Sequence, residues 1–159
     1  MGDNQYIPIM IQSLKKKSEI LDVIMELNLR QSEELEDPTL DPDDFDKTVE
    51  KKSKQIEQLE LLDNGFQELF EKVKDDLKAH PDVYHDEIAQ MQDYIRKLTS
   101  KSATIQVQEA RNKDLMTRKF ASVHKQVREV RKSQKVVNQY YKNMMKNTYG
   151  ESVFTDRKK

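Results

Sequence analysis

The sequence has no cysteine, and only three glycines and four prolines among its 159 residues. Without cysteine the chain can form neither a disulfide framework nor a thiolate metal site, which favours an intracellular protein. Long apolar runs are also missing. The longest, YIPIMI at residues 6–11, is far too short to cross a bilayer, and Asp3 stands where a signal peptide carries a basic residue. We predict a cytoplasmic protein without membrane insertion.

Motifs for catalysis and for cofactor binding are absent from the sequence as well. There is no glycine-rich phosphate loop, no nucleophile elbow and no pairing of histidine with cysteine. The histidines, His80, His85 and His124, are too few and too scattered to predict a metal site. The acidic run DPDDFD lacks the glycine of a calcium loop and has Lys52 where the last ligand belongs. We expect no catalytic residue, no metal and no cofactor.

Charged residues are abundant, at 36% of the chain, and hydrophobic residues make up 35%. This balance is typical of long helices with charged exposed faces, and the length suits one domain. The net charge is −1, but residues 1–80 hold 11 basic and 20 acidic side chains, and residues 81–159 hold 17 and 9. The halves are therefore −9 and +8. This asymmetry favours an acidic helix packed beside a basic one.

Apolar residues recur at three- and four-residue steps along most of the chain, which predicts amphipathic helices. Pro38 and Pro42 would end the first helix, and Asp41 and Pro42 suit the cap and first position of the second. Pro81 ends that helix, and Asp82 is expected to cap the next. The expected helices span residues 7–35, 43–79, 82–98 and 103–147.

The second helix has the clearest register, a four-three alternation in which Lys52 and Asp63 alone are polar. It runs through Phe45, Val49, Lys52, Ile56, Leu59, Asp63, Phe66, Phe70, Val73 and Leu77. A spacing near 3.5 residues, sustained along a whole helix, predicts left-handed supercoiling against neighbouring helices. We therefore predict an all-α fold, an elongated antiparallel coiled-coil bundle of three to four long helices.

The number of helices depends on the segment between Leu98 and Met116, where the pattern weakens and Ile105 and Val107 are expected to be the main bulky anchors. A bend near residues 99–102 would give four helices. A local change of supercoil would instead join the last two into one rod. The single helical domain is expected to span residues 1–147, and a flexible tail residues 148–159.

Large, soft side chains gather near the carboxyl end, in NQYYKNMMKNTYG at residues 138–150. Tyr141 and Met144 continue the apolar stripe of the last helix and suit a core. Tyr140 and Met145 lie beside that stripe, so one narrow seam cannot bury all four. Methionine adapts to irregular partners and tyrosine offers a large contact area. We interpret this face as a docking surface for a partner helix.

Nucleic-acid binding is the competing interpretation of the same region. Residues 115–147 hold nine lysines or arginines and one acid, Glu129, interleaved with aromatic side chains. However, these cations flank a continuous apolar stripe, and a net charge near zero weakens attraction to phosphate. We expect no nucleic-acid partner.

The order of several motifs resembles that of the FlgN-type flagellar export chaperones. The acidic connector leads into KTVEKKSKQIEQLELLDNGFQELF, where a lysine precedes a hydrophobic and Glu-Leu-rich run at Lys54, Ile56, Leu59 and Leu62. The later EARNKDL supplies an asparagine followed three residues on by a leucine, at Asn112 and Leu115. The ending FTDRKK is similar to tails in that family.

This resemblance implies a cytoplasmic helical chaperone, not an enzyme. It would bind flagellar hook-associated (hook-filament junction) proteins before export, prevent their premature assembly and help deliver them to the flagellar export gate. The resemblance places client binding on the carboxyl-terminal helix and assigns Tyr149 to the export gate. The partner-binding residues would be Val123, Val127, Val130, Val137, Tyr140, Tyr141, Met144, Met145 and Tyr149. The alternative is a coiled-coil scaffold or self-associating adaptor, with the stripe buried in a homodimer.

Overall fold

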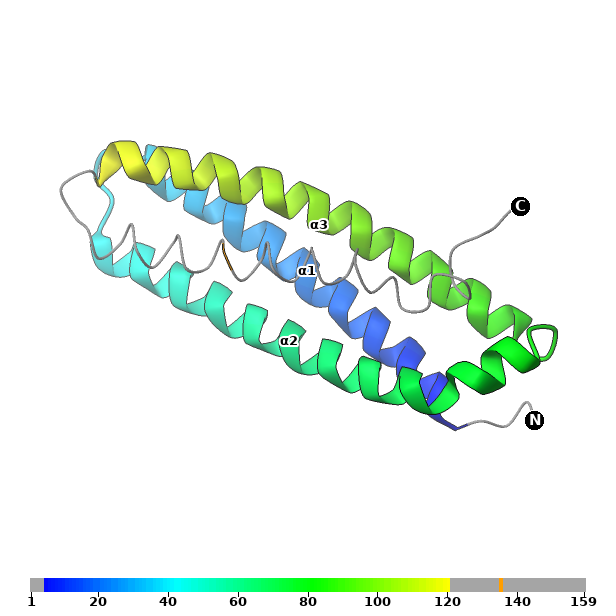
Figure 1. Cartoon of the computed structure of the whole chain (residues 1–159). Coiled ribbons are helices and arrows are strands. Elements are labelled where there is room, and N and C mark those ends of the chain that lie inside the picture. Colours follow the sequence, from blue (N-terminus) through cyan, green and yellow to red (C-terminus); the bar gives the residue numbers. More distant parts are fainter. Residues whose placement is uncertain (1–4, 121–134, 136–159) are drawn as a thin grey trace.

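Three long helices, each antiparallel to the next along the chain, form the part of the chain that the computed structural model describes, residues 5–120 and Lys135 (Figure 1). Helix α1 spans Tyr6–Glu36, α2 spans Pro42–Ala79 and α3 spans His85–Lys119. Helix α1 packs against both α2 and α3 along its length. The predicted all-α helical bundle is confirmed for the described residues.

The register predicted for α2 corresponds closely to its buried face. Phe45, Phe66 and Val73 are at most 1% exposed. Lys52, one of the two polar residues in the pattern, is completely buried, and the side chain of Asp63 is only 18% exposed. The stripe therefore faces the bundle core along the whole helix, its polar positions included.

The connector between α1 and α2 is stabilised by two aspartates. Asp37 Oδ1 accepts hydrogen bonds from the Thr39 amide at 2.9 Å and the Thr39 hydroxyl at 2.8 Å, which lower the pKa of Asp37. Asp41 Oδ1 accepts from the amide of Asp43 at 2.9 Å, and Pro42 occupies the first turn of α2. The second helix is therefore capped as the sequence predicts.

Replacing the capping aspartate tests this contribution. We expect Asp41→Ala to lower the free energy of unfolding by about 1 kcal/mol, because an amide of the first turn loses its acceptor. Asp46→Ala, at an exposed position further along the same helix, is the control and should change it by less than about 0.5 kcal/mol. Urea denaturation followed by circular dichroism measures both, and equal losses would argue against the cap.

The turn between α2 and α3 differs from the expectation that a helix begins at residue 82. The carbonyl oxygen of His80 accepts from the amides of Val83 at 3.1 Å and Tyr84 at 3.4 Å, so residues 80–84 form a turn. Tyr84 is 1% exposed, and its hydroxyl donates to Asp76 Oδ2 at 2.6 Å. These contacts delay the start of the helix to His85, and Asp82 does not cap it.

Helix α3 is continuous through residues 99–102, where a bend would have given four helices. Val107, expected as an anchor, is 71% exposed, so that expectation is wrong. The four-three stripe continues instead through polar residues. The buried positions are Leu98, Ser102, Ile105, Glu109, Asn112 and Met116.

The helix expected to begin at residue 103 does not begin there, because residue 103 lies inside α3. Residues 103–119 belong to α3, which ends at Lys119, and Phe120 follows it as the cap residue. The Phe120 ring packs on Phe45 with centroids 5.5 Å apart, beside buried Met116. The rest of the expected helix, apart from helical Lys135, lies outside the described residues, as does the expected tail.

Candidate functional site: a surface groove beside a buried polar network

The partner-binding residues predicted from the sequence lie beyond the described part of α3. The described chain reaches Phe120, whose ring is held against Phe45. The predicted residues outside the described ranges are Val123, Val127, Val130, Val137, Tyr140, Tyr141, Met144, Met145 and Tyr149. They stay predictions, and the described residues offer two other features: a network that holds the three helices together and a groove on the surface.

A buried lysine joins all three helices. Lys52 Nζ on α2 donates to Glu109 Oε1 on α3 at 2.7 Å, and to Gln31 Oε1 and Asn28 Oδ1 on α1 at 2.8 and 3.1 Å. An ammonium group has three donors, and all three are used. Lys52 and Glu109 are completely buried, so the ion pair lies in the core.

Asn112 extends this network along α3. Its Nδ2 donates to the backbone oxygen of Asn28 at 2.8 Å and also to Gln31 Oε1 at 3.4 Å. Burial lowers the pKa of Lys52, while the charge of Glu109 and its hydrogen bond oppose that shift. The network thus places a costly charge in the core, and acceptors on the other two helices satisfy the Lys52 ammonium group, which favours one register between the three helices.

A second buried lysine, Lys17, lies towards the other end of α1. Lys17 Nζ is 3.1 Å from Asp63 Oδ1 on α2 and 5.6 Å from the ring centroid of Phe66. Burial lowers the pKa of Lys17, and Asp63 opposes that shift. Both polar interruptions of the α2 stripe, Lys52 and Asp63, are therefore halves of ion pairs between helices.

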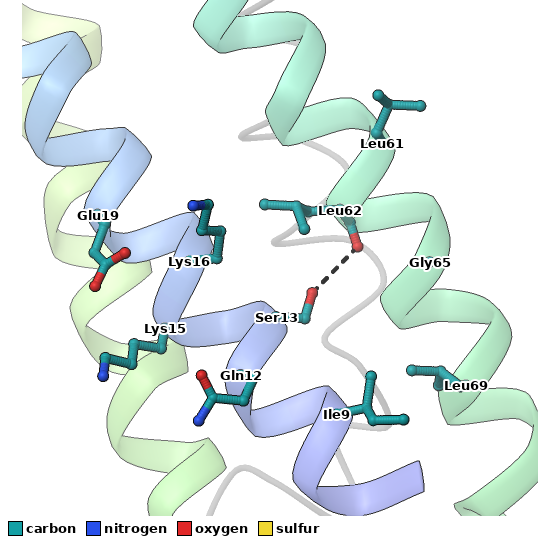
Figure 2. A pocket seen from close by; sticks show the side chains of 10 residues that line it. All are labelled: Ile9, Gln12, Ser13, Lys15, Lys16, Glu19, Leu61, Leu62, Gly65 and Leu69. Atoms are coloured by element: carbon teal, nitrogen blue, oxygen red, sulfur yellow. Dashed lines mark hydrogen bonds between the residues drawn. The ribbon is translucent and has the colours of Figure 1, made fainter.

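An open groove lies on the outer surface where α1 and α2 meet (Figure 2). It encloses about 560 Å³ and opens to solvent. Figure 2 shows Ile9 of α1 and Leu69 of α2 pointing towards one another across it, and Leu62 pointing towards α1. The hydroxyl of Ser13 donates to the backbone oxygen of Leu62 at 3.5 Å. The groove therefore has an apolar floor, with one polar contact bridging its two walls.

Basic side chains line the α1 side of this groove. Lys15 and Lys16 are exposed, and neither forms an ion pair with any residue of the described ranges. Glu19 is the only acid among the described lining residues. A second hollow, of about 680 Å³ along α1, is lined instead by acidic Asp22, Glu26 and Glu33. The two hollows therefore differ in charge.

The described residues can also be compared with the requirements of a metal site and of a membrane span. Within residues 5–120 and Lys135, no three His, Cys, Asp or Glu side chains are placed to hold a metal ion. No helix in these ranges is both long and apolar enough to cross a membrane. The arrangement found here suits contact with another polypeptide, because exposed apolar side chains are combined with unpaired charges.

Sequence reasoning did not identify the groove, although two signals for it are present. Leu61 stands beside Leu62 but off the α2 stripe, and it is 65% exposed. Gly65 interrupts an otherwise good helix-forming segment without ending the helix. An apolar residue off the stripe and an interior glycine on one helix together indicate a surface feature.

Comparison with known proteins places the chain in a family. The family model described as FlgN protein matches residues 1–149. No curated protein and no solved structure gives a significant match. The matched range covers all three described helices and every residue predicted to bind a partner.

Proposed function

Because the chain belongs to the FlgN family of flagellar export chaperones, which bind flagellar proteins, we propose that it is a cytoplasmic, non-enzymatic chaperone of hook-filament junction proteins. The observation that carries the proposal is the family match over residues 1–149. In this proposal the chain binds junction proteins before export, prevents their assembly in the cytoplasm and helps deliver them to the export gate.

The client-binding surface in this proposal is the apolar face of residues 123–145. Tyr140, Tyr141, Met144 and Met145 supply a broad contact area there, because methionine and tyrosine side chains adapt to a partner helix at little entropic cost. The amphipathic segment that a junction protein uses for assembly would lie on this face. Binding and premature assembly then exclude one another, and no nucleotide hydrolysis is needed.

The described structure supports such a role because the helix that precedes this segment is packed into the core at its end. The segment follows α3, whose last turns are anchored by Met116 in the core and by Phe120 on Phe45. Asn112 connects the same helix to α1. A docking face that begins at a rigid helix end loses less conformational freedom when a client binds.

Capture of a purified junction protein tests the proposal. We expect the full chain to retain it, and the variant with Tyr140, Tyr141, Met144 and Met145 all changed to Ser to retain at least about tenfold less, because most of the apolar contact is lost. The exposed residues Val83 and Val107, changed to Ser, provide the control. Circular dichroism checks that each variant is folded, and undiminished capture by the folded quadruple variant would contradict the proposal.

Measurement of solution mass separates this function from the scaffold alternative. A chaperone is expected to gain thermal stability when the junction protein is added, since the client binds the folded state. A tight dimer whose stability does not respond to the junction protein would indicate a self-associating scaffold instead.

Delivery is tested separately: Tyr149→Ala should reduce binding to the isolated export gate and leave client capture unchanged.

A further inference from the structure

We propose that the groove between α1 and α2 is a second docking site, which holds an amphipathic helix of a client with carboxylates along one edge. This inference rests on the proposed chaperone function and adds a site remote in sequence from the predicted carboxyl-terminal face. The groove is formed by Ile9, Leu62 and Leu69, with Leu61 at its outer edge. It lies between two antiparallel helices, so a third helix can pack lengthwise in it.

The exposure of apolar side chains around the groove is the first argument. Ile9 is 53% exposed and Leu61 is 65% exposed, although buried core residues lie close to each in sequence. Leu62 points towards α1, whereas Leu61 projects outward (Figure 2). A helix lying in the groove would cover Ile9 and Leu61 together and remove both from water.

Gly65 provides the second argument. It lies in the interior of α2, a helix of 38 residues, where glycine is less stable than alanine. A Cβ built on Gly65 would meet no atom of the described residues within 4 Å, so packing among those residues does not require a glycine. Gly65 does line the groove, and without a side chain it allows the backbone of a docked helix to approach α2 closely.

The positive charge beside the groove indicates which kind of helix it can bind. Lys15 and Lys16 project from the α1 side and are unpaired within the described ranges, so they favour a helix whose facing edge carries glutamate or aspartate. Residues 121–159 of this chain do not match that requirement, because they hold ten basic and only three acidic side chains. The occupant is therefore a helix from a client.

A titration with designed peptides tests the groove directly. The probe is a fluorescent helical peptide of about five turns, with leucines at three- and four-residue spacing and glutamates along one edge. Its matched counterpart carries lysines in place of the glutamates. We expect the full chain to prefer the glutamate peptide, Gly65→Leu to weaken its binding at least about tenfold by filling the groove, and Lys15→Glu with Lys16→Glu to reverse the preference.

The control variant is Asn64→Leu, which adds the same side chain at the neighbouring exposed position and should bind like the unchanged protein. Circular dichroism confirms that Gly65→Leu remains helical. The proposal is overturned if the two peptides bind equally, or if Gly65→Leu binds as well as Asn64→Leu. A change in the solution mass of the chain alone on Gly65→Leu also overturns it, since the groove is then an interface between copies.

Photo-crosslinking with the purified junction protein separates this inference from the proposed function. A photoreactive phenylalanine analogue at Leu61 should crosslink to the captured protein, and the same analogue at Val107, exposed on α3, should not. Capture without a crosslink from Leu61 overturns the groove as a client site and leaves the chaperone function standing. Absence of capture overturns the chaperone function, and the peptide titration then decides on the groove.

Discussion

Glu109→Ala is expected to lower the free energy of unfolding by about 3–5 kcal/mol, because it leaves the ammonium group of Lys52 buried without its counter-charge. Lys52 is completely buried and donates its shortest hydrogen bond, of 2.7 Å, to Glu109. The remaining acceptors, Gln31 and Asn28, are neutral amides. They cannot replace the carboxylate that compensates for the loss of hydration.

Replacing both members of the pair should be much less harmful than replacing one. The double variant Lys52→Met with Glu109→Leu removes both charges, so we expect it to recover most of the stability lost in Glu109→Ala. The exposed pair of Lys54 and Glu50, 3.4 Å apart on the surface of α2, provides the comparison. Glu50→Ala should cost less than about 1 kcal/mol, because an exposed pair is well solvated.

Denaturant unfolding monitored by circular dichroism measures these three variants and the unchanged protein under one set of conditions. A loss of similar size in Glu109→Ala and Glu50→Ala would contradict the proposed importance of burial. If the double variant were as unstable as Glu109→Ala, the shape of the two side chains, rather than their charge, would account for the loss. Recovery in the double variant would assign the cost to the unpaired ammonium group.

Phe66→Ala should also destabilise the chain by about 3–5 kcal/mol, because it removes a large side chain from a closed core and leaves a cavity. Phe66 is fully buried in the main cluster of α1, α2 and α3. Leu61, five positions earlier on the same helix, is 65% exposed. Leu61→Ala is expected to change the free energy of unfolding by less than about 0.5 kcal/mol.

For peptide binding, we expect Leu61→Ala to have a larger effect than Phe66→Ala. Leu61→Ala is expected to weaken binding of the glutamate peptide several-fold, because Leu61 forms the outer edge of the groove. The measurement pairs denaturant unfolding with fluorescence anisotropy for each variant. A large loss of stability in Leu61→Ala would show that this residue serves the core, and the surface role inferred for it would be wrong.

Much of α2 could be predicted because its determinants are local. The cap at Asp41, the proline at the first turn and the four-three spacing from Phe45 to Leu77 are all read within one helix, and the structure reproduces them. The inward-facing stripe follows from helix geometry once the spacing is known. The polar residues Lys52 and Asp63 could be located in this register, but their partners could not be identified from α2 alone.

The register of α3 was misjudged because polar residues occupy its core positions. Ser102, Glu109 and Asn112 follow the same spacing as the leucines and isoleucines around them, yet an apolar pattern does not count them. Asn112, on which part of the family resemblance rested, is 1% exposed and donates to the backbone of α1. Its burial becomes intelligible only when Asn28 and Gln31 are seen beside it.

By itself, the sequence determined where α1 and α2 lie, which face of α2 enters the core and to which family the chain belongs, because spacing, caps and motif order are properties of neighbouring residues. Only the tertiary structure decided that Lys52 is neutralised by Glu109, 57 residues further along the chain. Only the structure placed Ile9 opposite Leu69 in an open groove. Pairing between distant residues depends on how the helices align in space, and no local pattern records that alignment.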